Sequence, residues 1–149
     1  MPEAKNASEF FASGLNCAES VALAVCRALG MDTSLLPRMA TGFGGGIAGS
    51  GATCGALVGA IMAVGLMYGR NTPQDDRRRP YAISQRIYSA FEQEMGSTQC
   101  RQLTGLDLRT PEGYRQLFTS GVHERVCAKA VALAERLALE QLGQSRPHS

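Results

Sequence analysis

The chain has 149 residues, a length typical of one domain; 44% of them are hydrophobic and 19% are charged, which excludes an intrinsically disordered protein. The net charge is only +2, there is no Trp, and the aromatic residues are five Phe and four Tyr. These numbers argue against a nucleic-acid-binding protein, which must neutralise many phosphates and often stacks bases on aromatic rings. We therefore expect residues 1–149 to form one domain that binds no nucleic acid.

Helical signals follow one another along the chain, whereas alternating strand patterns are almost absent. The predicted helices span residues 3–13, 17–29, 34–40, 53–68, 79–95 and 97–103, a short segment opened by Thr110-Pro111, and residues 122–142. Asn16 is expected to cap the second helix, with Glu19 completing a capping box. Thr53 is the predicted cap of the fourth helix, and Ser97 or Thr98 that of the sixth.

An uncharged segment over residues 39–69 raises the question of a transmembrane helix. Ten of its residues are glycine, which disfavours a helix in its first half, and the helical part over residues 53–68 is shorter than the roughly 20 residues that a bilayer requires. We therefore expect no membrane span. The predicted fold class is all-α, an irregular bundle of about six to seven helices around this central, buried helix rich in Gly and Ala.

The N-terminus and the cysteine count together indicate a reducing compartment. Residues 1–11 lack the apolar stretch of a secretory signal peptide, so we expect a cytoplasmic protein. Five cysteines cannot all pair within one chain, and structural disulfides are rare in the cytosol. Metal binding or redox chemistry is the more common use of cysteines there.

Three cysteines are predicted at helix starts. Cys17 and Cys54 each directly follow a predicted cap, and Cys100 lies in the first turn of its helix. Free N–H groups and partial positive charge at such positions lower the pKa of a thiol and stabilise a thiolate or a cluster sulfur. Cys127 is expected about one turn into the last helix.

Cys26 differs from the other four cysteines. At about 100° per residue it lies on the opposite side of its helix from Cys17 and in line with Glu19. We interpret it as a small, half-buried residue without chemistry and leave it out of the site.

Spacing alone does not show that the other four cysteines form a site. No C-x-x-C pair is present and each cysteine comes from a different helix, so buried free cysteines are an equally good interpretation of the spacing. The glycine-rich segment resembles nucleotide-binding loops, but no strand precedes it and Ala52 replaces the lysine of a P-loop. Its backbone N–H groups could still face an anionic centre near Cys54. His123 lies on the same helix face as Cys127, which suits a ligand, although an exposed histidine is the simpler interpretation.

Several blocks of sequence carry a resemblance to a known family. They are Gly14-x-Asn16-Cys17-Ala18, Phe43-Gly44-Gly45-Gly46, Cys54-Gly55-Ala56-x-x-Gly59, Gly96-Ser97-x-x-Cys100, and Cys127 in an alanine-rich helix. This pattern resembles the four-cysteine redox-active proteins with a CGAxxG motif, over about residues 10–139. The resemblance implies a redox role for Cys17, Cys54, Cys100 and Cys127, and Cys26 lies outside it. A similar module in split-Soret cytochromes accompanies an iron–sulfur centre, which favours a cluster.

Three functions are compatible with these four cysteines. In the first, they hold an iron–sulfur cluster and exchange electrons with a redox partner that the sequence does not identify. In the second, the protein is a thiol–disulfide oxidoreductase with Cys54 as the candidate nucleophile. In the third and least favoured, the same four residues hold a structural zinc ion. The sequence leaves the oligomeric state open, a homo-oligomer included.

Overall fold

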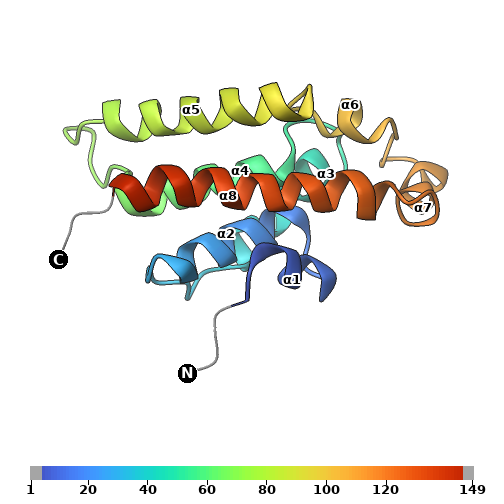
Figure 1. The fold of residues 1–149 in the computed structure, drawn as a ribbon, viewed down its shortest axis with the longest axis horizontal. Coiled ribbons are helices and arrows are strands. Elements are labelled where there is room, and N and C mark those ends of the chain that lie inside the picture. Colours follow the sequence, from blue (N-terminus) through green and yellow to red (C-terminus); the bar gives the residue numbers. More distant parts are fainter. Residues whose placement is uncertain (1–4, 146–149) are drawn as a thin grey trace.

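The structure, a computed structural model, describes residues 5–145, with side chains through Gly143 (Figure 1). Its elements are α1 (Ala7–Ala12), α2 (Cys17–Ala28), the 3-10 helix η1 (Arg38–Phe43), α3 (Gly44–Ile47), α4 (Gly55–Tyr68), α5 (Arg78–Met95), α6 (Cys100–Thr104), α7 (Pro111–Thr119), the π-helical segment η2 (His123–Cys127) and α8 (Ala128–Ser145). Within the described residues, the only β-type pairing is an isolated bridge between Thr53 and Gln99. The predicted all-α class and irregular bundle are confirmed.

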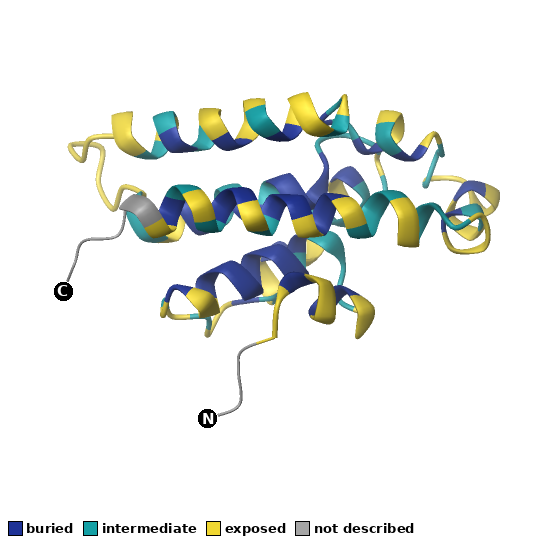
Figure 2. Ribbon diagram, viewed as in Figure 1, coloured by how far each residue is buried: buried dark blue, intermediate teal, exposed yellow. Residues whose placement is uncertain are grey.

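The core lies where α2, α5 and α8 pack around α4 (Figures 1 and 2). Leu57 of α4, Val21 of α2, Phe91 of α5 and Val131 of α8 are fully buried there. The helices α2 and α4 approach closely at Gly59, where a Cβ would lie 2.7 Å from the carbonyl oxygen of Ala18. The Gly- and Ala-rich composition of α4 is therefore what allows it to occupy the centre, as predicted.

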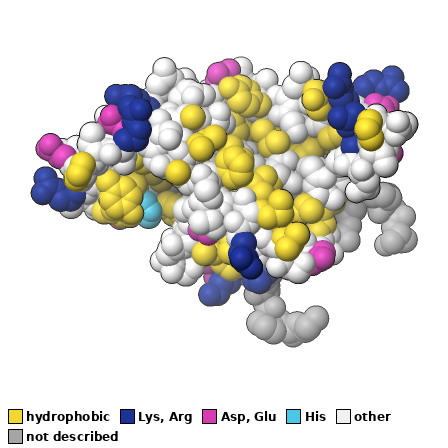
Figure 3. All heavy atoms as spheres, turned by 180° about the vertical axis from the view of Figure 1, so that it is seen from behind, with side chains coloured by type: hydrophobic (Ala, Val, Ile, Leu, Met, Phe, Trp, Pro, Cys, Tyr) yellow, Lys and Arg dark blue, Asp and Glu magenta, His cyan; other side chains and the backbone are white. Residues whose placement is uncertain are grey.

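The C-terminal end of α4 reaches the surface. Leu66 is 54% exposed, and together with Leu35 and Met39 it lines a second cavity of about 330 Å³. Figure 3 shows hydrophobic side chains spread over the face seen from behind. None of the helices in the described part of the chain is long and apolar enough to cross a membrane.

Two N-terminal elements differ from their predictions. The helix predicted over residues 3–13 begins at Ala7, because Asn6 and Glu9 form a capping box; residues 3 and 4 lie outside the described residues. The α-helix predicted over residues 34–40 is wrong: turns lead into the 3-10 helix η1 instead. Pro37 accounts for this difference, since it has no N–H for the interior of an α-helix.

The C-terminal half follows its predictions more closely. The helix α5 begins one residue before its predicted start, and Thr110 caps α7 by accepting a hydrogen bond of 3.0 Å from the N–H of Gly113. The last helix is not α-helical throughout, because its first turn is the π-helical segment η2. Such turns contain one extra residue and frequently occur at functional sites.

Candidate functional site

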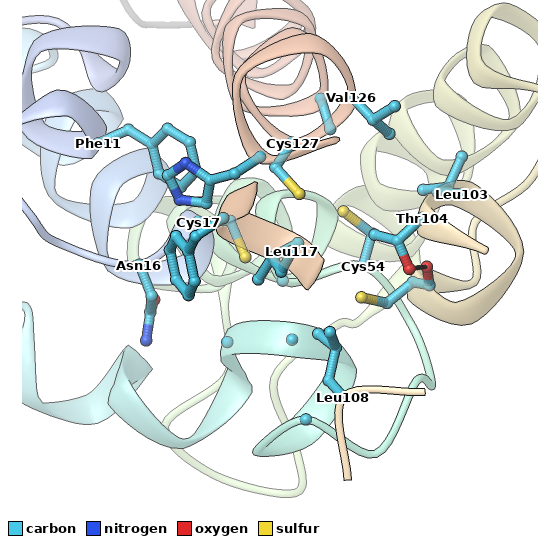
Figure 4. Close-up of a pocket in the computed structure, with 18 of the residues that line it drawn as sticks. Phe11, Asn16, Cys17, Cys54, Leu103, Thr104, Leu108, Leu117, Val126 and Cys127 are labelled. Atoms are coloured by element: carbon cyan, nitrogen blue, oxygen red, sulfur yellow. Dashed lines mark hydrogen bonds between the residues drawn. The ribbon is translucent and has the colours of Figure 1, made fainter. Parts of the chain in front are cut away.

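Four of the five cysteines line one cavity of about 550 Å³. They are Cys17, Cys54, Cys100 and Cys127, and Figure 4 shows the sulfur atoms of the three that it labels in the same space. Cys26 does not line this cavity, and the expectation that it is half-buried is wrong, because it is completely buried. The helix α2 packs against α1, α4, α8 and η1, which leaves little of its surface exposed. The fold thus brings together the four cysteines that the sequence selects.

Cys17 is the first residue of α2 and is held by the predicted capping box. The side chain of Asn16 accepts a hydrogen bond of 2.8 Å from the N–H of Glu19, and Glu19 accepts one of 2.8 Å from the N–H of Asn16. The second carboxylate oxygen of Glu19 accepts a hydrogen bond of 2.7 Å from the Thr41 hydroxyl. The cap therefore fixes Cys17 and also ties the start of α2 to the segment that enters the glycine-rich turn.

Cys54 and Cys100 are positioned by the bridge between Thr53 and Gln99, since each cysteine directly follows one of the bridge residues. The N–H of Cys54 donates to the carbonyl of Thr98 at 2.7 Å, and the N–H of Cys100 donates to a carbonyl of the opposite segment, also at 2.7 Å. Side chains alternate along such a pair, so both thiols lie on the same side of it.

The bridge also explains why the predicted caps of these two helices are wrong. Cys54 itself is the N-cap of α4, because Thr53 is part of the bridge. Gln99, and not Ser97 or Thr98, is the N-cap of α6, and its side chain makes no capping hydrogen bond. The Ser97 hydroxyl accepts a hydrogen bond of 3.0 Å from the N–H of Gln99, one residue before the helix begins.

The glycine-rich segment forms a turn of left-handed helix beside the cysteines. Residues 45–48 have φ angles of 67°, 69°, 68° and 51°. Gly46 is required there, because a Cβ would lie 2.6 Å from the backbone nitrogen of Ala52 and 2.8 Å from the Cβ of Cys100. The N–H of Gly45 forms a hydrogen bond to the Cys17 thiol. The turn therefore directs a backbone donor at Cys17, whereas the expectation for this segment named a centre near Cys54.

Burial determines the thiol pKa values. It raises the pKa of Cys17, although N–H groups such as those of Gly45 and Ala18 act in the opposite direction. Burial and, second, repulsion from Cys17 raise the pKa of Cys54 to about 12. The same two causes raise the pKa of Cys100 to about 11 and that of Cys127 to about 12. The expectation that helix starts lower these pKa values is therefore wrong for the metal-free site: N–H donors are present, but desolvation outweighs them.

The cavity wall carries no formal charge: among the described residues that line it there is no Lys, Arg, Asp or Glu. One part of the wall is aromatic. The His123 ring is stacked on Phe11 with 4.3 Å between centroids, and its centroid is 5.0 Å from that of Phe118. Sequence reasoning noted His123 only for its spacing from Cys127 and missed the two Phe side chains, because they come from α1 and α7.

The chemistry of the donor set fits an iron–sulfur group. Thiolates are the ligands that iron–sulfur clusters require, and backbone N–H groups near sulfur are the usual accompanying donors. Within residues 5–145, no three His, Cys, Asp or Glu side chains are placed to share one metal ion. The four sulfurs are thus distributed around a space instead of meeting at one point.

Comparisons with known proteins agree with the pattern of cysteines. Residues 15–141 match the family described as "Putative redox-active protein (C_GCAxxG_C_C)". The chain is similar to a protein of Archaeoglobus fulgidus named "Uncharacterized protein", with 36% identity over an alignment of 137 positions that covers 85% of this chain and 84% of the relative. No solved structure matches the chain.

Proposed function

The chain belongs to the C_GCAxxG_C_C family of redox-active proteins, and from this premise we propose that it is an electron-transfer protein whose four cavity cysteines hold an iron–sulfur cluster. The observation that carries the proposal is the meeting of Cys17, Cys54, Cys100 and Cys127 around one cavity without charged side chains. When bound, such a cluster supplies reversible one-electron transfer.

The protein's own contribution is to hold, orient and shield the sulfurs. Backbone hydrogen bonds from Gly45, Ala18 and Ala56 converge on Cys17, where they offset negative charge on the sulfur. Cys54 is 7% exposed and Cys100 is 8% exposed, so the fold keeps bulk water away from two of the ligands. Hydrogen bonding and burial of this kind are two of the means by which a protein sets the potential of a cluster.

The raised thiol pKa values argue against thiol–disulfide exchange at neutral pH. A thiol with a pKa of about 12, as at Cys54, is protonated at neutral pH and is a poor nucleophile, because the thiolate is the reactive form. A metal cation replaces the thiol proton and supplies the positive charge that the cavity lacks. The distributed sulfurs likewise favour a cluster over a structural zinc ion, which needs four ligands around one point.

The test is anaerobic purification followed by a visible spectrum and assays of iron, acid-labile sulfide and zinc. We expect absorption near about 400 nm, with iron and sulfide in matching amounts. Replacing each of Cys17, Cys54, Cys100 and Cys127 by Ser should reduce the bound iron. The matched control is Cys26→Ala, which removes the one cysteine outside the cavity and should leave the iron content unchanged.

Three results would contradict the proposal. A colourless protein without iron that forms a reversible internal disulfide would establish the thiol–disulfide alternative. One zinc ion per chain without sulfide would establish a structural metal site. Loss of iron in Cys26→Ala as severe as in the four Ser variants would show that the cavity does not define the ligand set.

A further inference from the structure

We propose that the same cavity also binds a small, uncharged, planar aromatic molecule beside the four cysteines, against the wall formed by Phe11, His123 and Phe118. This inference goes beyond the proposed electron transfer, because it concerns a second occupant of the cavity. It rests on the size of the cavity, the absence of charge in its wall and the arrangement of its rings.

The cavity is larger than a cluster needs. Its volume of about 550 Å³ is within the usual range of small-molecule sites, which is about 300–1,000 Å³. That volume equals roughly 18 water molecules at about 30 Å³ each. The largest of the common clusters that four cysteines bind has a core of about eight iron and sulfur atoms. Space for a second molecule with roughly ten non-hydrogen atoms remains.

The wall selects against ions. No Lys, Arg, Asp or Glu of the described residues lines the cavity, so a charged ligand would lose hydration without gaining an opposite charge. Two of its polar side chains already have partners. The Thr104 hydroxyl donates to the carbonyl of Cys100 at 2.9 Å, and the Asn16 amide donates to the carbonyl of Thr41 at 3.0 Å. An uncharged ligand therefore fits this wall best.

The rings favour a flat partner. They form a continuous row, in which His123 stacks on Phe11 at an interplanar angle of 19° and Tyr114 meets Phe118 edge to face at 5.4 Å. Phe118 is 49% exposed and Tyr114 is 57% exposed, so the outer part of the row still has uncovered ring surface. Offset or edge-to-face contact with a further ring would cover that surface. Figure 4 shows Phe11 near Cys17, at the end of the cavity away from Thr104.

His123 adds one polar feature to the expected ligand. Neither ring nitrogen has a hydrogen-bond partner among the described residues, and the ring lines the cavity. A ligand with a single N–H or O–H group can therefore form a hydrogen bond with a ring nitrogen of His123. Indole, an uncharged planar molecule of about nine non-hydrogen atoms, combines this group with the required size and is the probe we choose.

The experiment is a titration of the anaerobically purified full chain with indole, followed by indole fluorescence. Because the chain has no Trp, fluorescence excited at a wavelength selective for indole comes from the ligand alone. We expect saturable binding that Phe118→Ala weakens by at least about tenfold. The matched control is Tyr81→Ala, which removes a ring that is 58% exposed on α5 and outside the cavity, and should bind indole as the parent protein does. Circular dichroism should show the same helix content in both variants.

A charge series and a second variant complete the test. With the metal-free protein, whose cavity holds no anionic cluster to attract a cation, indole-3-acetate and tryptamine, which carry opposite charges on the same ring, should each bind at least about tenfold more weakly than indole. Phe118→Leu, which keeps an apolar side chain without a ring, should also weaken binding. No saturable binding, equal binding by Phe118→Ala, or tighter binding of either charged analogue would overturn the proposal.

Iron is measured on the same samples, so the two proposals can fail separately. A coloured protein that does not bind indole would overturn the inference about the ligand alone. A colourless protein that binds indole at Phe118 would overturn the cluster and leave the ligand site standing.

Discussion

At Gly55 the site has no room for a single methyl group. A Cβ there would lie 2.6 Å from the Cys17 sulfur and 2.7 Å from the carbonyl oxygen of Phe43. We expect Gly55→Ala to lower the free energy of unfolding by about 1–3 kcal/mol and to displace Cys17, because the added carbon must move a sulfur and a backbone atom. Urea unfolding of the metal-free protein and the bound iron measure the two effects.

The matched control is Gly65→Ala in the same helix. A Cβ at Gly65 meets nothing within 4 Å, and the residue is exposed and helical. The free energy of unfolding should therefore rise by about 0.4–1 kcal/mol, through the loss of unfolded-state entropy. If the two variants changed stability in the same direction, the contact between Gly55 and Cys17 would not be the cause.

The buried thiols also make the stability of the metal-free protein depend on pH. Their pKa values are raised from 9.0 on folding, to about 12 at Cys54. Above about pH 9 the unfolded chain therefore releases thiol protons that the folded chain retains, so stability is complete below that pH and is lost as the pH rises. For a thiol as buried as Cys54, the loss is about 1.4 kcal/mol for each pH unit.

Urea unfolding of the metal-free protein at about pH 8 and about pH 10 measures this dependence. Cys26→Ala should reduce the slope, because the pKa of Cys26 is also raised by burial, to about 11. A free energy of unfolding that is the same at both pH values would show that the thiols are accessible to water in the folded chain.

At the level of elements, the left-handed turn over residues 45–48 contains two residues that disfavour its conformation. Ile47 has a φ of 68° and Ala48 a φ of 51°, in a region where a residue with a Cβ costs about 1–2 kcal/mol. Ile47 is also 46% exposed, so its side chain gains little from burial. We expect Ile47→Gly to raise the free energy of unfolding by up to about 1 kcal/mol, because the relief of strain exceeds the added entropy of glycine.

The comparison for that variant is Leu66→Gly. Leu66 is similarly exposed, but it lies in the right-handed helix α4, so glycine should lower the free energy of unfolding by about 1 kcal/mol. Opposite signs for the two substitutions, measured by thermal or urea unfolding, are the expected result. A loss of stability in Ile47→Gly equal to that in Leu66→Gly would mean that the turn is not strained.

Local signals in the sequence predicted the elements that local interactions determine. The capping box of Asn16 and Glu19 and the helix start at Thr110-Pro111 are determined by residues within one turn of each other, and each is confirmed. The cap predicted at Thr53 failed because a residue 46 positions away, Gln99, pairs with it. The left-handed turn was also not predictable, since Ile47 and Ala48 adopt it only because the surrounding contacts require it.

The cysteine site shows the same limit on a larger scale. Helix geometry separated Cys26 from Cys17, and the structure places only Cys17 in the cavity. The spacing of the cysteines along the chain does not show that α2, α4, α6 and η2 meet. Only the resemblance to a family indicated that their four cysteines act together. The thiol pKa values were predicted in the wrong direction, because the sequence reveals a helix start but not how deeply the start is buried.

For the whole molecule, a cavity without charge has a consequence for the potential of the proposed cluster. Reduction adds a negative charge, and no cationic side chain of the described residues lines the cavity to offset it. We therefore expect a low reduction potential. Leu108→Lys, at a side chain that lines the cavity, should raise the potential by roughly 90 mV, which is about 2.1 kcal/mol for unit charges about 8 Å apart at an effective dielectric constant of about 20.

The control is Leu35→Lys, which adds the same charge at a side chain that is 65% exposed and lines the other cavity. Its potential should stay close to that of the parent, because charges beyond about 10 Å are screened in salt. An electrochemical titration of both variants measures the difference. Equal shifts in the two variants would show that net charge, and not charge in the cavity wall, sets the potential.

The positions of the cysteines along the chain determine when the site can exist during synthesis. Cys17 emerges from the ribosome about 110 residues before Cys127, which is about 5–20 s earlier at usual rates of elongation. Until the last helix is synthesised, the chain cannot complete its fold. The earlier cysteines are then exposed to water and can be oxidised. If the proposed cluster is bound, delivery of iron and sulfide must therefore follow synthesis of the chain.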